Sequence, residues 1–245
     1  MSKVSIIGAG EVGASCATCL AERDFVNEII IVDVMQGLAE GNALDLRQSA
    51  AVKRFDTIVK CFTGDYPATA NSDVVVITAG APRKPGMERS DLLTTNAKIV
   101  SEVSRQVAKC YTSIGGIPIR NLMDEAKVQD AIHRTQLGGE EIIGHLGRSG
   151  WYAAVSAVCE MVESVICDQR RVFPACAYLK GEYGYEDIYL GVPVIIGKNG
   201  VEKVIELELD PDDKEHFDIS QRNVRTTLEI MKKLAVGRWP LAISR

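Results

Sequence analysis

The sequence predicts an α/β protein whose first half forms a doubly wound parallel sheet and whose second half is α+β. Two features of the first half support this prediction. Unbroken apolar runs such as Ile29–Val32 and Val74–Ile77 indicate strands buried on both faces, as in a parallel sheet covered by helices. These runs alternate with segments of helical spacing, and short connections rich in glycine join them. That order is typical of repeated βαβ units.

The expected elements of the first half follow one another closely along the chain. Strands are expected at Val4–Ile7, Glu28–Val34, Thr57–Phe62 and Asp73–Thr78. Helices are expected at Val12–Arg23 and Gln36–Ala50, and a third runs from Glu88 to about Lys109, after a loop rich in turn-forming residues.

The second half has a different pattern. Helices are expected at Asp124–Leu146, Trp151–Cys167 and from Asp210 to about Leu234, and strands at Arg170–Leu179, Ile188–Ile196 and Val201–Leu209. Asn199-Gly200 lies between two apolar runs, which predicts a hairpin whose central residues both take a positive φ. An antiparallel sheet of this kind sets the second half apart, so we expect two domains, residues 1–110 and 111–245.

Composition excludes several classes of protein. The 28 Lys and Arg against 33 Asp and Glu give a net charge of −5, which argues against nucleic acid as the main partner. No apolar run approaches the roughly 20 residues of a membrane helix. Because Met1–Lys3 lead directly into a predicted strand, we also expect no signal peptide.

The cysteines favour a reducing compartment. Seven of them are scattered along the chain, an odd number that does not suggest a disulfide framework, so we expect a cytoplasmic protein. Cys16 and Cys19 have the spacing of a redox pair or of half a zinc site. No second pair or nearby histidine completes a metal site, and both residues fall inside a predicted helix, so we favour packing against the sheet and expect no metal.

The strongest functional motif is Gly8-Ala9-Gly10-Glu11-Val12-Gly13, a G-x-G-x-x-G pattern that follows a predicted strand and opens a helix. Gly8 permits a tight turn, Gly10 lets backbone approach a pyrophosphate, and Gly13 lets the helix pack closely on the strand. The helix N-terminus supplies N–H groups to the phosphates. The motif therefore predicts a Rossmann-type dinucleotide site made of Gly8, Ala9, Gly10, Glu11, Val12 and Gly13.

Asp33 ends the next predicted strand, about 20 residues after the last glycine, as this motif requires. Its carboxylate is expected to accept hydrogen bonds from the adenosine ribose and to repel a 2′-phosphate, which favours NAD over NADP. The alternative is that the glycines serve only a tight turn and that Asp33 caps the following helix.

These residues and the stretch Ile77–Asn96, which reads ITAGAPRKPGMERSDLLTTN, resemble malate dehydrogenases of the lactate-dehydrogenase-like bacterial branch. Gly139–Ile142, Ser149–Ala154 and the stretch from Tyr183 to Lys203 are similar to the C-terminal domain of that family. The resemblance covers the chain up to about Leu234, and the tail Ala235–Arg245 matches nothing in it. It implies an NAD-binding domain over residues 1–110 and a substrate and oligomerisation domain over 111–245.

The resemblance also assigns substrate residues. Arg83 and Arg89 match arginines of a mobile lid that bind the carboxylates of malate or oxaloacetate, and Asn96 matches a cofactor-contacting asparagine. An arginine suits this role because its planar fork binds a carboxylate through two hydrogen bonds. Lactate-specific relatives carry a neutral residue at the position of Arg83, so we expect a dicarboxylic substrate. The alternative is a solvated charged loop without a ligand.

The family's acid/base pair is missing. Its histidine belongs to a Gly-Gly-His-Gly motif and its aspartate to a Leu-Asp-x-x-Arg motif, and the chain contains neither. The family pattern breaks after Cys110 and resumes on the order of 60 or more residues later, at roughly 30 residues per strand–helix unit. Of the histidines, His133 and His216 fall on polar helix faces and His145 precedes a turn, and none is assigned as the base. The loss also leaves the strand at Asp73–Thr78 as an apolar sheet edge.

The resemblance implies an enzyme of the tricarboxylic acid cycle that transfers a hydride between NAD and malate or oxaloacetate, as a homodimer or homotetramer. For this chain we expect NAD binding with little or no turnover. A catalytically silent NAD-binding or assembly protein is the alternative from another class, and a lactate dehydrogenase is the second enzymatic alternative.

Overall fold

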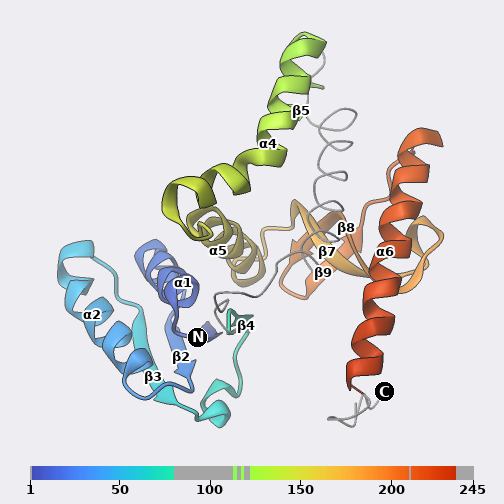
Figure 1. Ribbon diagram of the computed structural model, residues 1–245. Coiled ribbons are helices and arrows are strands. Elements are labelled where there is room, and N and C mark those ends of the chain that lie inside the picture. The colour runs from blue at the N-terminus through green and yellow to red at the C-terminus, as the bar shows by residue number, and fades with distance from the viewer. Residues whose placement is uncertain (1, 80–112, 115–116, 119–121, 210, 236–245) are drawn as a thin grey trace. The chain divides into compact units, whose positions relative to one another are not determined.

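The computed structural model describes residues 2–79, 113–114, 117–118, 122–209 and 211–235 (Figure 1). Within these residues the chain forms two compact units. The first consists of the described parts of Met1–Pro85, Arg148–Phe173 and Ile195–Lys203, and the second of those of Gly86–Gly147, Pro174–Val194 and Val204–Arg245. The expected domain boundary at residue 110 lies outside the described residues and stays a prediction.

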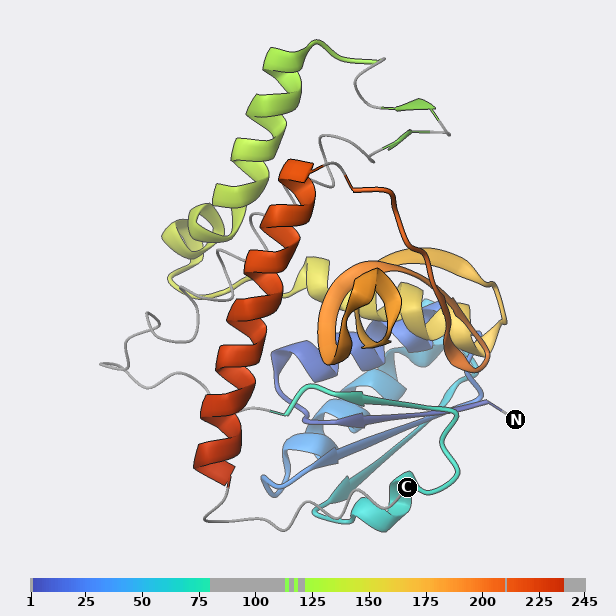
Figure 2. The same ribbon diagram turned by 90° about the vertical axis from the view of Figure 1, so that its right-hand side faces the viewer.

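The first unit contains the predicted parallel sheet. Its strands are β1 (Lys3–Ile7), β2 (Glu28–Asp33), β3 (Ile58–Thr63) and β4 (Val74–Ile77), in the order β3-β2-β1-β4. All neighbouring pairs are parallel, which confirms the α/β prediction. Helices α1 (Glu11–Arg23) and α2 (Leu38–Lys53) connect β1 to β2 and β2 to β3, and Figure 2 shows them on one face of the sheet. Right-handed crossovers that run in the same direction place both helices on that face.

Burial differs between the inner and outer strands of this sheet. Val4 and Ile6 of β1 and Ile29 and Ile31 of β2 are fully buried, as the continuous apolar runs predicted. In β4, by contrast, Ile77 is 72% exposed. In the sheet that the described residues form, β4 is an outer strand with a neighbour on one side only. The segment Asp73–Thr78 therefore lies at a sheet edge, as expected. A short 3-10 helix, η1 (Tyr66–Thr69), precedes β4.

Helix α5 (Tyr152–Ile166) comes from the second half of the sequence but belongs to the first unit, where it packs against α1. Its residues Val155 and Val162 join the hydrophobic core around Leu20 of α1. Arg23 at the end of α1 forms ion pairs with Glu160 at 2.8 Å and Glu163 at 2.6 Å. The core of the first unit is thus completed by a helix more than a hundred residues further along the chain.

The contact between α1 and α5 also explains the cysteine pair of α1. Cys16 and Cys159 are fully buried and share a hydrogen bond. That bond and burial raise the pKa of the Cys159 thiol, so it stays protonated and behaves as a small apolar group. The described cysteines are free thiols, and no three His, Cys, Asp or Glu residues among the described ones are placed to hold a metal ion. Cys16 therefore packs, as the sequence favoured.

In the second unit, helix α4 (Glu125–Leu146) begins at the predicted position. The side chain of Asp124 caps it by accepting a hydrogen bond from the N–H of Lys127 at 2.9 Å. Before it, the two-residue strands β5 (Ser113–Ile114) and β6 (Ile117–Pro118) form an antiparallel pair. Among the described helices, none has both the length and the apolar character that crossing a membrane requires.

A second sheet has the order β7-β8-β9, with β7 at Arg171–Lys180, β8 at Glu186–Gly197 and β9 at Gly200–Val204. The predicted hairpin between β8 and β9 is present, but β9 ends five residues earlier than expected. The expected backbone of the turn is wrong as well: Gly200 has a φ of +81°, whereas Asn199 is not among the described residues with positive φ. A two-residue turn followed by a left-handed glycine is the usual geometry when a bulge adjoins the turn.

Helix α6 (Pro211–Ala235) packs on a tyrosine-rich turn that contains the 3-10 helix η3 (Glu182–Gly184). The rings of Tyr183 and Tyr185 lie with their centroids 5.1 Å and 5.6 Å from that of Phe217. Lys214 donates a hydrogen bond to the hydroxyl of Tyr185 at 3.0 Å. The N-terminal half of α6 is therefore fixed by aromatic packing within the second unit.

Candidate functional site

The glycine-rich loop that the sequence singled out connects β1 to α1 at the carboxyl end of the parallel sheet. Gly8 is buried, with a φ of +106°, and its N–H donates to the carbonyl oxygen of Val32 at 2.8 Å. A Cβ at this position would lie 2.7 Å from the backbone nitrogen of Ala79. Both the conformation and the space therefore require glycine.

The other two glycines have different surroundings. A Cβ on Gly13 would lie 1.8 Å from the carbonyl oxygen of Gly8, so α1 approaches the loop backbone directly. Gly10 is exposed, and a Cβ there would meet nothing within 4 Å. It is the N-cap of α1, and no side chain caps this helix end. The first N–H groups of α1 are thus available to a ligand beside an open position at Gly10.

Asp33 at the end of β2 turns back toward this loop. Its Oδ2 accepts a hydrogen bond from the N–H of Ala9 at 2.6 Å, and its Oδ1 accepts one from the N–H of Met35 at 2.8 Å. These bonds hold the pKa of the Asp33 carboxyl below its ordinary value, because both favour the ionised form. The alternative role, capping the next helix, is wrong: the N-cap of α2 is Gly37, without a side-chain cap.

Two side chains that the sequence did not single out support the loop. Asn42 of α2 donates from Nδ2 to the carbonyl oxygen of Ala9 at 2.7 Å. Thr78, just after β4, donates from its hydroxyl to the carbonyl oxygen of Gly8 at 3.1 Å. No motif marks either residue. Their only signal is position, since Thr78 follows the strand that pairs with β1 and Asn42 lies one turn into the helix after Asp33.

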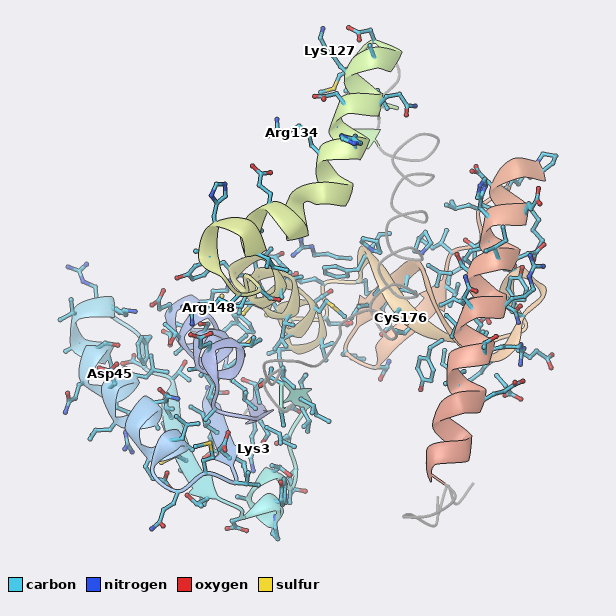
Figure 3. All side chains as sticks on the ribbon, in the orientation of Figure 1. Lys3, Asp45, Lys127, Arg134, Arg148 and Cys176 are labelled. Atoms are coloured by element: carbon cyan, nitrogen blue, oxygen red, sulfur yellow. The ribbon has the colours of Figure 1, made fainter. Side chains whose placement is uncertain are left out.

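The remaining loop residues have distinct roles. Ala9 is almost fully buried, and Val12 packs against the hydrophobic core. Glu11, the first residue of α1, forms an ion pair with Arg148, which Figure 3 shows beside that helix. The guanidinium carbon of Arg148 lies 4.7 Å from the ring centroid of Trp151. An arginine from the second half of the sequence therefore reaches the N-terminus of α1.

The predicted substrate residues Arg83 and Arg89, and the predicted cofactor residue Asn96, lie outside the described residues. So does the break in the family pattern between Cys110 and Tyr111. The structure therefore brings together the six loop residues and Asp33, and the roles of the other three stay predictions.

The three histidines lie on helices of the second unit. His133 and His145 are exposed on α4, and His216 on α6 is half-buried. His216 is therefore less solvated than its polar helix face suggested. These positions give no reason to assign any of the three as a catalytic base.

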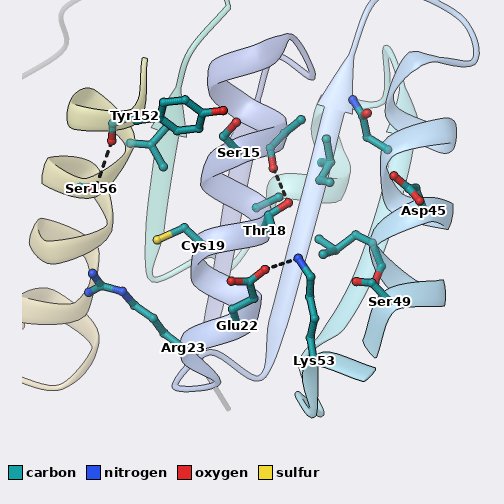
Figure 4. A pocket seen from close by; sticks show the side chains of 16 residues that line it. Ser15, Thr18, Cys19, Glu22, Arg23, Asp45, Ser49, Lys53, Tyr152 and Ser156 are labelled. Carbon is teal, nitrogen blue, oxygen red and sulfur yellow. Dashed lines mark hydrogen bonds and ion pairs between the residues drawn. The ribbon is translucent and has the colours of Figure 1, made fainter. Parts of the chain in front are cut away.

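A groove of about 870 Å³ lies elsewhere in the first unit, along α1 between α2 and α5 (Figure 4). Its lining includes Thr18, Cys19 and an ion pair between Glu22 and Lys53. Neither the glycines of the loop nor Asp33 line it. The groove therefore lies outside the candidate dinucleotide loop, although Asn42, which supports that loop, also lines the groove.

Comparison with protein families gives two matches that together span most of the chain. Residues 2–143 match the NAD binding domain of lactate/malate dehydrogenases. Residues 96–235 match the alpha/beta C-terminal domain of the same family.

Individual relatives agree with these matches. The malate dehydrogenase of Cytophaga hutchinsonii is 38% identical over 307 residues, which covers 95% of this chain and 98% of the relative. The solved structure of malate dehydrogenase from Salinibacter ruber matches with a TM-score of 0.80 and 32% identity, over 96% of this chain and 99% of that one. The apo malate dehydrogenase of Picrophilus torridus matches with a TM-score of 0.84 and 29% identity, over 97% and 99% of the two chains.

Alanine at Gly13 and alanine at Gly10 are expected to affect different properties, the first the stability of the fold and the second the affinity for the dinucleotide. In Gly13→Ala the Cβ collides with backbone, so the free energy of unfolding should fall by about 3 kcal/mol. In Gly10→Ala the Cβ enters open space at a φ of −67°, so stability should stay within about 0.5 kcal/mol while dinucleotide affinity falls. Urea unfolding and calorimetric titration with NAD measure the two quantities. Equal stability of the two variants would contradict the packing assigned to Gly13.

Replacing Asp33 by asparagine should change how stability depends on pH. The lowered pKa means that Asp33 stabilises the fold above its ordinary pKa of 3.8, and that this contribution disappears as the pH falls through the lower folded-state value. At neutral pH, Asp33→Asn should cost about 1 kcal/mol, since the side chain is only partly buried. In urea unfolding, the difference in stability between this variant and the parent should disappear as the pH falls below the folded-state pKa of Asp33. Asp45→Asn on the exposed face of α2 is the control for the loss of one negative charge. A difference in stability between Asp33→Asn and the parent that does not change with pH would contradict the role assigned to the Asp33 carboxylate.

Proposed function

Because this chain belongs to the lactate/malate dehydrogenase family, we propose that its function is that of an NAD-dependent malate dehydrogenase. Such an oxidoreductase moves a hydride between NAD and the malate–oxaloacetate pair. The observation that supports the binding half of this function is the loop from Gly8 to Gly13, closed onto Asp33 by the hydrogen bond from Ala9. The same contacts favour it over a simple tight turn, which needs neither an uncapped helix end nor a carboxylate at the adjacent strand.

The residues of the loop fit NAD. The open position at Gly10 lets the pyrophosphate approach the backbone, and the uncapped end of α1 offers N–H donors to it. Each oxygen of Asp33 accepts one backbone hydrogen bond and keeps a second lone pair for a ribose hydroxyl. Because the carboxyl is ionised at neutral pH, it repels the 2′-phosphate of NADP. The cofactor itself supplies the hydride chemistry when bound.

The substrate is proposed to be a small dicarboxylic acid. Arg83 and Arg89 would each hold one carboxylate, and Asn96 would contact the cofactor. Two relatives, 38% and 34% identical to this chain, support this choice, because they are malate dehydrogenases. Arg83 also argues against a lactate dehydrogenase, whose monocarboxylic substrate gives a second arginine nothing to pair with.

Catalysis is proposed to be impaired because the segment that carries the acid/base pair is absent. The alignment with the Cytophaga hutchinsonii relative extends over 307 residues, whereas this chain has 245. Because the match covers 95% of this chain, or about 233 residues, roughly 74 positions of the alignment face no residue here, in agreement with the loss of at least two strand–helix units after Cys110. Without a base to accept the hydroxyl proton of malate, hydride transfer loses a factor of roughly 10²–10⁴.

A catalytically silent NAD-binding or assembly protein is the second candidate function. The exposed edge of the parallel sheet favours it, since Val75 and Ile77 of β4 are 46% and 72% exposed. An apolar edge strand is a surface that another chain can cover, which is consistent with a homodimer or homotetramer. The free thiols of the described cysteines suit a reducing compartment, and we propose that the protein is cytoplasmic. Its proposed reaction belongs to the tricarboxylic acid cycle.

Binding and turnover are expected to separate in one pair of assays. NAD at about 100 times its Kd should raise the Tm by roughly 5 °C, and NADP should raise it less. The same preparation should oxidise NADH with oxaloacetate at least about 100-fold more slowly than a family member that has the acid/base pair. Asp33→Asn is the control for binding and should lose most of the NAD-dependent rise. Oxaloacetate-dependent turnover at the rate of such a family member would overturn the proposed loss of catalysis. A preference for pyruvate would favour lactate dehydrogenase, and no Tm rise with NAD would contradict both candidate functions.

The proposed absence of the segment is tested on the protein itself. Trypsin should release the peptide Cys110–Arg120, in which Cys110 is bonded directly to Tyr111. The intact mass should be 26.7 kDa. Mass spectrometry of protein from its natural source checks both values. A heavier protein, with further peptides between these two residues, would contradict the proposal and restore the expectation of full activity.

A further inference from the structure

Glu11 presents an electrostatic conflict at the proposed NAD site. It is the first residue of α1, its side chain is 53% exposed, and it lies at the helix end that would receive the pyrophosphate. In the free protein a carboxylate at this end is favourable, because it complements the partial positive charge of the helix N-terminus. For a bound pyrophosphate the same carboxylate is unfavourable, since both groups are negative.

The ion pair with Arg148 removes this conflict. Arg148 is 137 residues away in sequence, and its Nη1 donates a hydrogen bond to Oε1 of Glu11. The guanidinium also lies over the ring of Trp151, which orients it by a cation–π contact. Arg148 is 58% exposed, and these two contacts orient its guanidinium.

The position of Arg148 depends on rigid elements. It precedes α5 in the first unit, and α5 is packed on α1 through the buried pair Cys16 and Cys159. The ion pairs of Arg23 with Glu160 and Glu163 join the same two helices near the other end of α1. Arg148 lies in the short connection between Gly147, the C-cap of α4, and Trp151, the N-cap of α5, so the packed helix pair anchors the end of this connection beside the N-terminus of α1.

We propose that Arg148 is a positioning residue for the cofactor: it neutralises Glu11 and so keeps the N-terminus of α1 attractive to the pyrophosphate of NAD. This inference rests on the proposed function, because it concerns the same NAD site. The inference adds Arg148 to the site as a residue that acts through Glu11. Because the two residues are far apart in sequence, no local motif reveals this role.

The test is a double-mutant cycle read as NADH affinity by calorimetric titration, which needs no turnover. Arg148→Gln should weaken NADH binding about five-fold at low ionic strength, as expected for two phosphate charges near one uncompensated carboxylate in water. The loss should shrink in high salt. Glu11→Gln combined with Arg148→Gln should restore the parent affinity, and Arg148→Lys should retain most of it.

Lys60→Gln is the matched control. It removes one positive charge from another ion pair of the first unit, with Glu28 at the start of β2, which is the end of the sheet away from the loop. This variant should bind NADH as the parent does. The Tm of each variant without NADH is measured as well, so that a loss of affinity can be distinguished from a loss of folded protein.

Each result decides the inference. Unchanged affinity in Arg148→Gln overturns it while leaving the proposed function intact. A loss that the double variant does not restore also overturns it, because Arg148 would then bind the phosphates directly. No NADH binding by the parent chain overturns the proposed function and the inference with it.

Discussion

The close approach of two backbone segments at Gly8 and Gly13 is the constraint on which the first unit depends. A side chain at Gly13 would place its Cβ 1.8 Å from the Gly8 carbonyl oxygen, so α1 rests on the turn only if this position has none. That contact determines where α1 begins and where its unpaired N–H groups lie. It also brings the N–H of Ala9 to the carboxylate of Asp33, so a hydrogen bond joins the turn to the end of β2.

The return of α5 to the first unit is the second feature that shapes the site. Apolar packing holds it there, because exposed ion pairs such as those of Arg23 contribute only about 0–1 kcal/mol each. The buried side chains of Val155, Cys159 and Val162 complete a core that α1 and the strands begin. As a consequence, a cation from the second half of the sequence is held at the N-terminus of the first helix.

Most of the fold could be predicted from the sequence because its elements follow local rules. Four strands of the parallel sheet and the helices on either side of Asp33 begin and end within a few residues of their expected positions. The early end of β9 and the geometry at Asn199-Gly200 could not be predicted, because turn type depends on the pairing of both strands. The exposure of Ile77 agrees with the apolar sheet edge that was expected from the missing next strand, and not from the local apolar run.

The sequence by itself determined the glycine-rich motif, the acidic residue at the end of β2, the family and the absence of that family's His and Asp motifs. These features follow from spacing along a short stretch of chain, or from the presence or absence of a motif. Only the tertiary structure decided that Asn42, Thr78 and Arg148 support the loop and its helix. The physical reason is that each contact joins residues brought together by strand order or helix packing, and no spacing rule encodes such proximity.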